Sequence, residues 1–417
     1  ISVMESLIYF TIIIILVGGH LLNVLIELIN TSYSKKAQLD EVVSDVYDSE
    51  SYAKQQSYEQ EKLNASLVES TFMVVITTAA FILGYFGLLN DTIAQNIENR
   101  VLQSLVFFGV LWFIGQILSI PFDYYDSFVI EERYGFNKST RKLFFTDILK
   151  SALLTIILGG IILSLITWLY VSYPTLFWLP VLVFILILSL FSTILYTSII
   201  LPLFNKKSPL SDGELKDKLE RLALNAGFSA KNIFVLDSSK RSTKGNAFFT
   251  GWGRNKRIYL YDTLVDKLSA EEIEAVLAHE IGHYKKRHIW INFAISLSVT
   301  GIFLFLFTKI SSSDIFTPVF GSTSNGMPNF QLNILGFALI FGPVQSIIGL
   351  FTNFLSRKME FSADNFANGF GLSNPLVSAL KKLAAQNYSN LTPHPLYVII
   401  HYSHPPLVQR IKALLSF

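Results

Sequence analysis

Seven long apolar segments constrain the fold of this chain more than any other feature. Each is about 20 residues long, enough for a helix to cross a hydrocarbon layer of about 30 Å. Charged residues make up only 15% of the chain, whereas soluble domains average about 25%. The sequence therefore predicts a mainly α, polytopic membrane protein. The predicted spans are Leu7–Ile29, Leu67–Leu89, Val101–Pro121, Leu153–Tyr170, Phe177–Leu201, Ile289–Phe307 and Leu332–Leu355.

The spans divide the chain into four parts. Residues 1–204 contain five spans with their loops, and residues 289–355 contain the sixth and seventh. Between them, residues 205–288 are polar and predict a small α/β segment, and residues 356–417 predict a helical tail with a Pro-rich turn. In the α/β segment, the pattern predicts a helix at Asp212–Gly227 and strands at Ile233–Leu236, Asn246–Gly251 and Ile258–Tyr261.

Lysine and arginine are concentrated in alternate connections between the spans. The first, third and fifth connections and the tail are basic, whereas the second contains only Arg100 and the sixth only Lys309. Because basic loops face the cytoplasm, the α/β segment and the tail are expected on the cytosolic side of the membrane. A bacterial inner membrane and an endoplasmic reticulum membrane both fit this pattern.

Polar residues within the spans allow two interpretations. His20, Gln116 and Asn292 either face an internal aqueous space or only form hydrogen bonds to neighbouring helices. The net charge of +2 gives no reason to expect nucleic acid as a partner.

A metal-binding motif, His279-Glu280-Ile281-Gly282-His283, ends the polar segment. Ser269 and Glu272 have the spacing of a capping box, and apolar residues at helical period follow them, so Ser269–His288 is predicted to be a helix. Histidines four residues apart share one helix face and can bind one zinc ion, with Glu280 beside it as the general base. The chain contains no cysteine, so histidine and carboxylate side chains must supply the ligands of such an ion.

A third ligand is expected from the tail, on the same side of the membrane. Glu360 can complete a site of two histidines and one glutamate, and Asp364, one turn later, can accept the outer N–H of a ligating imidazole. The alternative is that these two carboxylates only form a solvated helix face.

Oxyanion stabilisation requires a further donor, and the tail offers His401, His404 and Arg410. The alternative for His404 is that it or Ser403 caps a helix whose first turn contains Pro405 and Pro406.

Several stretches of the chain resemble the type I CAAX prenyl proteases, which are integral-membrane zinc metallopeptidases of the gluzincin group. The resembling stretches are Glu131–Asn137, Pro202–Lys206, Ser238–Ser242, Asn246–Gly251, His279–His283, Ser356-Arg357 with Glu360 and Asp364, and His401–Pro405.

The resemblance implies seven helices that form a barrel around a water-filled chamber, with one zinc ion at its cytosolic end. It implies that His279, His283 and Glu360 bind the zinc and that Glu280 is the base. It also implies that His404 and Arg410 stabilise the oxyanion or the substrate carboxylate. The backbone of Asn246, Ala247, Phe248 and Phe249 would align the substrate. Members of this family remove the last three residues after a prenylated cysteine.

These features are compatible with three functions. The first is a membrane zinc endopeptidase that trims prenylated C-termini, with a peptide and membrane lipid as partners. The second is a quality-control protease that cuts damaged membrane proteins; such proteases usually have about four spans, whereas five spans precede the motif here. The third is a non-catalytic membrane protein with a structural zinc site, which would need four protein ligands and no base. Span count and Glu280 favour the first.

Overall fold

The structure is a computed structural model that describes residues 3–227, 233–250, 257–323 and 329–416. Within these residues, seven helical segments are long and apolar enough to cross a membrane. The prediction of a mainly α, polytopic membrane protein with seven spanning helices is confirmed. The seven segments are Val3–Ser34, Ser49–Ile82, Arg100–Arg133, Arg141–Ser172, Trp178–Phe204, His288–Ser311 and Phe330–Asn368.

Four of these segments are single helices, and three contain a turn of π-helix. The single helices are α1 (Val3–Ser34), α2 (Ser49–Ile82), α13 (His288–Ser311) and α15 (Phe330–Asn368). The third span combines α4 (Arg100–Tyr125), η2 (Asp126–Ile130) and α5 (Glu131–Arg133). The fourth combines α6 (Arg141–Leu154), η3 (Thr155–Gly159) and α7 (Gly160–Ser172), and the fifth combines α8 (Trp178–Leu195), η4 (Tyr196–Ile200) and α9 (Leu201–Phe204).

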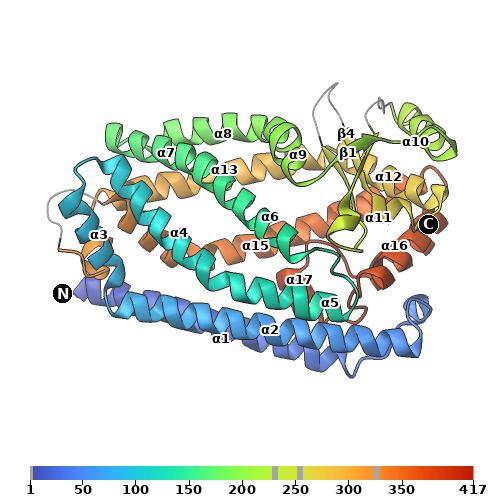
Figure 1. Ribbon diagram of the computed structural model, residues 1–417, viewed down its shortest axis with the longest axis horizontal. Coiled ribbons are helices and arrows are strands. Elements are labelled where there is room, and N and C mark those ends of the chain that lie inside the picture. Colours follow the sequence, from blue (N-terminus) through green and yellow to red (C-terminus); the bar gives the residue numbers. More distant parts are fainter. Residues whose placement is uncertain (1–2, 228–232, 251–256, 324–328, 417) are drawn as a thin grey trace.

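The seven segments enclose an open interior rather than packing into a solid bundle. In Figure 1, α1 and α2 run along one side, α8 and α13 along the opposite side, and α4, α6 and α15 between them. Only 0–11% of the residues in the most apolar window of each segment are buried. A solid bundle would bury one face of every helix. The helices therefore form a barrel-like chamber whose inner face is also accessible.

The helices extend beyond the predicted spans at the end that holds the sheet. Helix α2 begins at Ser49, well before the predicted Leu67, and α15 continues past the predicted Leu355 to Asn368. Hydropathy identifies only the part of a helix that lies in hydrocarbon, so the polar start of α2 was missed, whereas the helix predicted after Leu355 is present as the continuation of α15. Helix α2 ends at Ile82, before the predicted Leu89, because Gly84 adopts a left-handed φ of 72° before the next helix.

The end of the barrel that holds the N-terminus is closed by short helices and a buried polar cluster (Figure 1). These helices are α3 (Tyr85–Asn96) and α14 (Phe316–Val319). Gln331 donates to Asn90 over 2.7 Å and accepts from Ser104 over 3.2 Å, and all three side chains are buried. These bonds satisfy polar groups that would be costly to bury alone, and they tie three helices together.

A four-stranded sheet with short helices covers the opposite end of the barrel, where the C-terminus also lies (Figure 1). The strand order is β1-β2-β4-β3, with β2 parallel to β4 and the other pairs antiparallel. The sequence did not predict β1. The strands are β1 (Lys207–Pro209), β2 (Ile233–Leu236), β3 (Ala247–Thr250) and β4 (Arg257–Tyr261). The short helices are η1 (Glu41–Val43), α10 (Glu214–Asn225), η5 (Ser238–Lys240) and α11 (Asp262–Val265).

Four helices complete the structure around this sheet. They are α12 (Ala270–Lys285), α16 (Ser373–Gln386), α17 (Pro395–His401) and α18 (Leu407–Leu415). Helix α12 packs into an apolar core with α10, β2, β4 and α16, in which Leu264, Ile273 and Ile281 are almost fully buried. This core fixes the one helix that carries the metal-binding motif.

Candidate active site

The sequence of α12 fixes where its histidines point. Ser269 accepts from the backbone N–H of Glu272, and the Glu272 side chain accepts from the backbone N–H of Ser269, so the predicted capping box is present. The helix ends at Lys285 because Arg287 adopts a left-handed φ of 59°, and α13 begins at His288. The N-terminal cap and the buried apolar face therefore hold the motif as one rigid helix.

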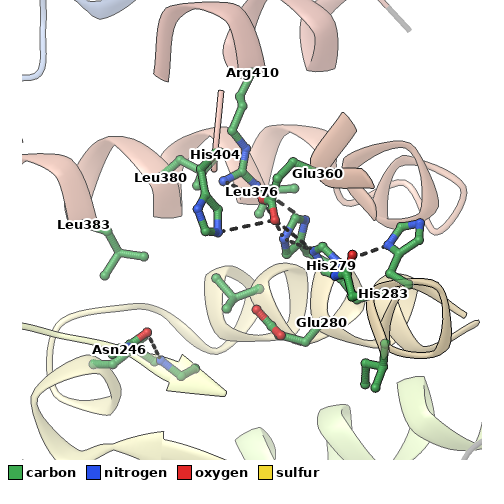
Figure 2. A pocket seen from close by; sticks show the side chains of 16 residues that line it. Asn246, His279, Glu280, His283, Glu360, Leu376, Leu380, Leu383, His404 and Arg410 are labelled. Atoms are coloured by element: carbon green, nitrogen blue, oxygen red, sulfur yellow. Dashed lines mark hydrogen bonds and ion pairs between the residues drawn. The ribbon is translucent and has the colours of Figure 1, made fainter. Parts of the chain in front are cut away.

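His279, His283 and Glu360 present their side chains to one point, although Glu360 comes from α15 (Figure 2). The Nε2 atoms of the two histidines are 3.2 Å apart. Glu360 Oε2 is 3.4 Å from His279 Nε2, and Glu360 Oε1 is 3.2 Å from His283 Nε2. Glu360 Oε2 is buried without a hydrogen-bond partner. Two imidazoles and an orphaned carboxylate oxygen are a donor set that fits a metal ion.

The outer nitrogen of each histidine is held by another side chain. His279 Nδ1 is 2.8 Å from Asp364 Oδ1, the contact expected from the sequence. His283 Nδ1 is 3.0 Å from His288 Nδ1. Such outer contacts fix the tautomer and the ring orientation of a ligating histidine, and they leave both Nε2 atoms for the metal. The sequence interpretation missed His288, although a histidine five residues after His283 at the start of the next helix was a visible signal.

Arg410 completes this arrangement from α18. Its Nε and Nη2 donate to Asp364 over 2.9 and 2.6 Å, and its Nη1 lies 3.5 Å from Glu360 Oε2. Asp364 is fully buried, and Arg410 is 8% exposed. Arg410 thus contacts both carboxylates of α15 that lie next to His279.

Gly282 allows α12 and α15 to approach closely enough for these contacts. A Cβ atom at Gly282 would lie 3.1 Å from the Cα and 3.2 Å from the backbone oxygen of Ala363, which sits between Glu360 and Asp364. Any larger residue would push the two helices apart at the point where they supply the metal donors.

A cavity of about 420 Å³ opens in front of the donor set. Glu280, His404 and Asn246 line it, and Figure 2 shows the Glu280 carboxylate pointing into it beside the histidines. Burial raises the pKa of Glu280 above the usual value of a carboxyl group. Three leucines of α16 form its apolar wall, Leu376, Leu380 and Leu383. The helical spacing of these leucines is visible in the sequence and predicts one apolar face of a helix, but it does not show that this face lines a cavity.

His404 lies in the cavity, whereas His401 is not among its lining residues. His404 Nε2 is 3.3 Å from Glu360 Oε1, and its side chain is 66% exposed. His401 instead packs against the Tyr397 ring, with the ring centres 4.6 Å apart. Of the two histidines, only His404 can contact a bound peptide at this site.

The predicted substrate strand is the edge strand β3 together with the preceding Asn246. Asn246 and Ala247 line the cavity. The Phe248 ring stacks on Tyr259 of β4, with the ring centres 5.2 Å apart, so this side chain packs on the sheet, and Phe248 is not among the residues that line the cavity. The side chain of Phe249 lies outside the described part of the chain.

Comparisons with known proteins agree with this architecture. Residues 29–206 match the family described as CAAX prenyl protease N-terminal, five membrane helices, and residues 209–417 match peptidase family M48. CAAX prenyl protease 1 of Saccharomyces cerevisiae is 36% identical over 404 residues, covering 91% of this chain and 89% of the relative. The Arabidopsis thaliana homologue is 33% identical and covers 99% and 97%.

A solved structure gives the same result for the fold. The crystal structure of S. mikatae Ste24p superposes with a TM-score of 0.91 at 33% identity, covering 98% of this chain and 99% of that chain. Matches of this extent and identity, together with the donor set, establish the family. The protein belongs to peptidase family M48, among the membrane metalloproteases of the CAAX prenyl protease type.

Proposed function

We propose that the protein is a zinc metalloendopeptidase that removes C-terminal residues from prenylated proteins. The observation that carries this proposal is the convergence of His279, His283 and Glu360 on one point, with Glu280 beside them in the same cavity. The names of the relatives, CAAX prenyl protease 1, supply the substrate class.

Zinc is the metal that this donor set favours. Ligands about 2.1 Å from a tetrahedral ion lie roughly 3.4 Å apart, close to the observed separations of 3.2 to 3.4 Å. Zinc bound by these three residues supplies a Lewis acid that polarises the scissile carbonyl and lowers the pKa of water. The change Glu360→Ala should lower the zinc content measured by elemental analysis. An undiminished content would place the third ligand elsewhere.

Glu280 is the general base in this proposal. Its carboxylate takes a proton from the attacking water and delivers it to the leaving amine nitrogen. The Glu280 carboxylate points into the cavity beside the three metal donors, where the attacking water would lie (Figure 2). The change Glu280→Gln retains the shape and the three metal donors but removes the base.

His404 is proposed to donate to the carbonyl oxygen as negative charge develops on it. It lines the cavity and is exposed enough to reach a substrate. Loss of one such donor costs about 100-fold or more in kcat. The change His404→Ala should therefore lower turnover while zinc stays bound. Unchanged turnover would contradict this role; the capping alternative is wrong, because the N-cap of α18 is Pro406 and no side chain in the described part of the chain caps that helix. Arg410 is proposed to support this charge indirectly through Glu360 and Asp364.

The active side of the membrane is proposed to be the cytosolic one. Support comes from the distribution of basic residues. The basic connections and the tail lie at the end of the barrel that holds the sheet and α12. The connections at the opposite end have few basic residues, Arg100 and Lys309. The relatives named above come from eukaryotes, which favours the endoplasmic reticulum over a bacterial membrane. Protease accessibility of a tag at the C-terminus in sealed microsomes tests this; protection would reverse the topology.

We also propose that the four predicted parts of the chain act as separate functional parts: residues 1–204 and 289–355 as the barrel, and residues 205–288 and 356–417 as the catalytic end. The two family matches meet between residues 206 and 209, which supports the first boundary. The open barrel is proposed to hold the prenyl chain and membrane lipid, because few residues in the most apolar windows of its helices are buried. Photo-crosslinking of a prenyl-labelled peptide outside the barrel helices would contradict this.

The decisive experiment compares a farnesylated CAAX peptide with its unfarnesylated twin. The purified protein should cut the lipidated peptide preferentially, and Glu280→Gln should abolish the cleavage while zinc remains bound. Equal cutting of both peptides would contradict prenyl recognition and favour a quality-control protease of broad specificity.

A further inference from the structure

A second cavity, of about 490 Å³, adjoins the active-site cavity at the start of β3. The two cavities share Asn246 in their linings. Arg241 and Lys244 are the charged residues among the described residues that line the second cavity, and both are cationic. An anionic group is therefore the ligand that this cavity fits.

The guanidinium of Arg241 is fixed from behind. Its Nε and Nη2 donate to Asp147 over 2.7 and 3.0 Å, and its Nη1 donates to Asn205 over 3.1 Å. A guanidinium has five N–H groups, so two of them are left for a ligand. Asp147 lines a neighbouring cavity and not this one, so it holds the cation without occupying the space in front of it.

Lys244 is fixed in the same way. Its Nζ lies 3.0 Å from Glu131 Oε2 and donates to the Tyr58 hydroxyl over 2.9 Å. Its side chain is still 35% exposed, and Glu131 also lies in the neighbouring cavity. Both cations are held in place before a ligand arrives, which lowers the entropic cost of binding.

The edge strand determines which part of a peptide reaches these cations. The backbone oxygen of Asn246 accepts from Tyr261 N–H over 3.0 Å, so the backbone groups of Asn246 face β4. Because successive residues of a strand in an antiparallel ladder point their backbone groups to opposite sides, those of Ala247 face the free edge of the sheet. The Ala247 N–H is meanwhile held by the Asn246 side chain over 2.8 Å (Figure 2). A peptide paired antiparallel to β3 runs its C-terminus past Asn246 towards Lys244.

Hydrogen bonds fix the backbone of the segment that precedes β3. The carbonyl of Lys244 accepts from the Thr263 hydroxyl over 2.9 Å, and Gln386 of α16 donates to the carbonyl of Thr243. The carbonyl of Arg241 accepts from the backbone N–H of Lys138 over 3.0 Å. The cations therefore keep a constant distance from the scissile position.

We propose that Lys244 and Arg241 bind the C-terminal carboxylate of the substrate and so set how many residues are removed. Three extended residues span about 10 Å, and Lys244 precedes Ala247 by three residues in the chain along which the peptide would run. The inference rests on the proposed function, because it assumes that a peptide is cut in the cavity that Glu280 lines.

The test uses two farnesylated CAAX peptides that differ only in ending in a free carboxylate or a carboxamide. Wild-type protein is expected to cut the acid with a kcat/KM about tenfold or more above the amide, the effect of one charge-assisted hydrogen bond. Lys244→Met should remove this preference by raising KM for the acid, with kcat on the amide unchanged. Lys244→Arg should restore the preference.

Lys240→Met is the matched control, because Lys240 is a nearby cation that pairs with Asp237 and is not among the residues lining the cavity. It should retain the wild-type preference. The inference fails if wild-type protein does not distinguish acid from amide, or if the preference survives in Lys244→Met. In both cases the amide is still cut and the proposed function stands. Failure to cut either peptide overturns the proposed function and the inference with it.

Discussion

Arg410 and Asp364 form a buried bidentate ion pair directly behind the metal donors, with Nε and Nη2 of the arginine 2.9 and 2.6 Å from the two carboxylate oxygens. Asp364 in turn holds His279 Nδ1. The pair therefore links the last helix of the chain to the ligand on α12. A charge buried to this degree is tolerated because it is paired and hydrogen-bonded.

Replacing Arg410 should affect metal binding as well as stability. Arg410→Met leaves Asp364 as a buried unpaired charge, which should lower the free energy of unfolding by about 3–5 kcal/mol. Arg410→Lys should have an intermediate effect on stability and metal binding, because lysine cannot bind both oxygens in this geometry. Thermal unfolding and zinc content measure the two effects. Lys412→Met on the same helix breaks only an exposed pair with Asp40 and should change little. Full zinc content and stability in Arg410→Met would show that the arginine acts on the substrate alone.

Removing the imidazole of His288 should weaken zinc binding without removing a ligand. His288→Leu frees the outer nitrogen of His283, and loss of such a contact typically lowers metal affinity 10- to 100-fold. Competition with a chelator measures the affinity. Asn292→Ala, which changes the same cavity without touching the bond between the two histidines, is the control. Equal affinities in the two variants would contradict a positioning role for His288.

The change Gly282→Ala should separate α12 from α15. Its Cβ would meet Phe366 Cβ at 3.0 Å and the Ala363 backbone at 3.1 to 3.2 Å, and such overpacking costs about 1–3 kcal/mol. Because Ala363 lies between Glu360 and Asp364, activity and zinc content should fall together with the melting temperature. Gly349→Ala in α15 has open space around its Cβ and should be tolerated. Normal zinc binding in Gly282→Ala would mean that the helices can shift without moving the ligands.

The cap of α12 should make stability depend on pH in the acid range. Burial alone would raise the pKa of Glu272, but hydrogen bonds from Lys382, Ser378 and the Ser269 backbone hold it below its usual value. The stability that this carboxylate contributes is therefore present above its unfolded pKa of about 4.3 and is lost as the pH falls through the lower folded pKa. Glu272→Gln should lower the melting temperature at pH 7, and its difference from wild type should shrink below about pH 4. A constant difference across this range would refute the linkage.

Local patterns predicted the parts of the site that lie on one element. The spacing of His279 and His283 and the capping box at Ser269 determine which face of α12 binds the metal, and both are visible in the sequence. Glu360 is separated from them by two spans, yet the number of spans placed it on the same side of the membrane. The structure brings all three side chains together.

Features that depend on packing between distant segments could not be predicted. Nothing local shows that Arg410 faces Asp364 or that Asp147 holds Arg241, because these pairs form across 46 and 94 residues of chain. The strand β1 is three residues long and exists because β2 provides its partner. The sequence predicted the seventh span and a helix after it, but not that one unbroken helix, α15, contains both, since hydropathy does not register how a helix continues outside the membrane.

The uninterrupted course of α15 has a mechanical consequence. A helix of 39 residues is a rod of about 58 Å, and this one is anchored in the barrel at one end while Glu360 and Asp364 lie near the other. The histidines sit on α12, which is separated from its own membrane helix by the break at Arg287. Glu360 lies about 45 Å along this rod from Phe330, beyond the roughly 30 Å that a hydrocarbon layer spans, so the membrane anchors α15 while the ligand that it carries stays outside the lipid.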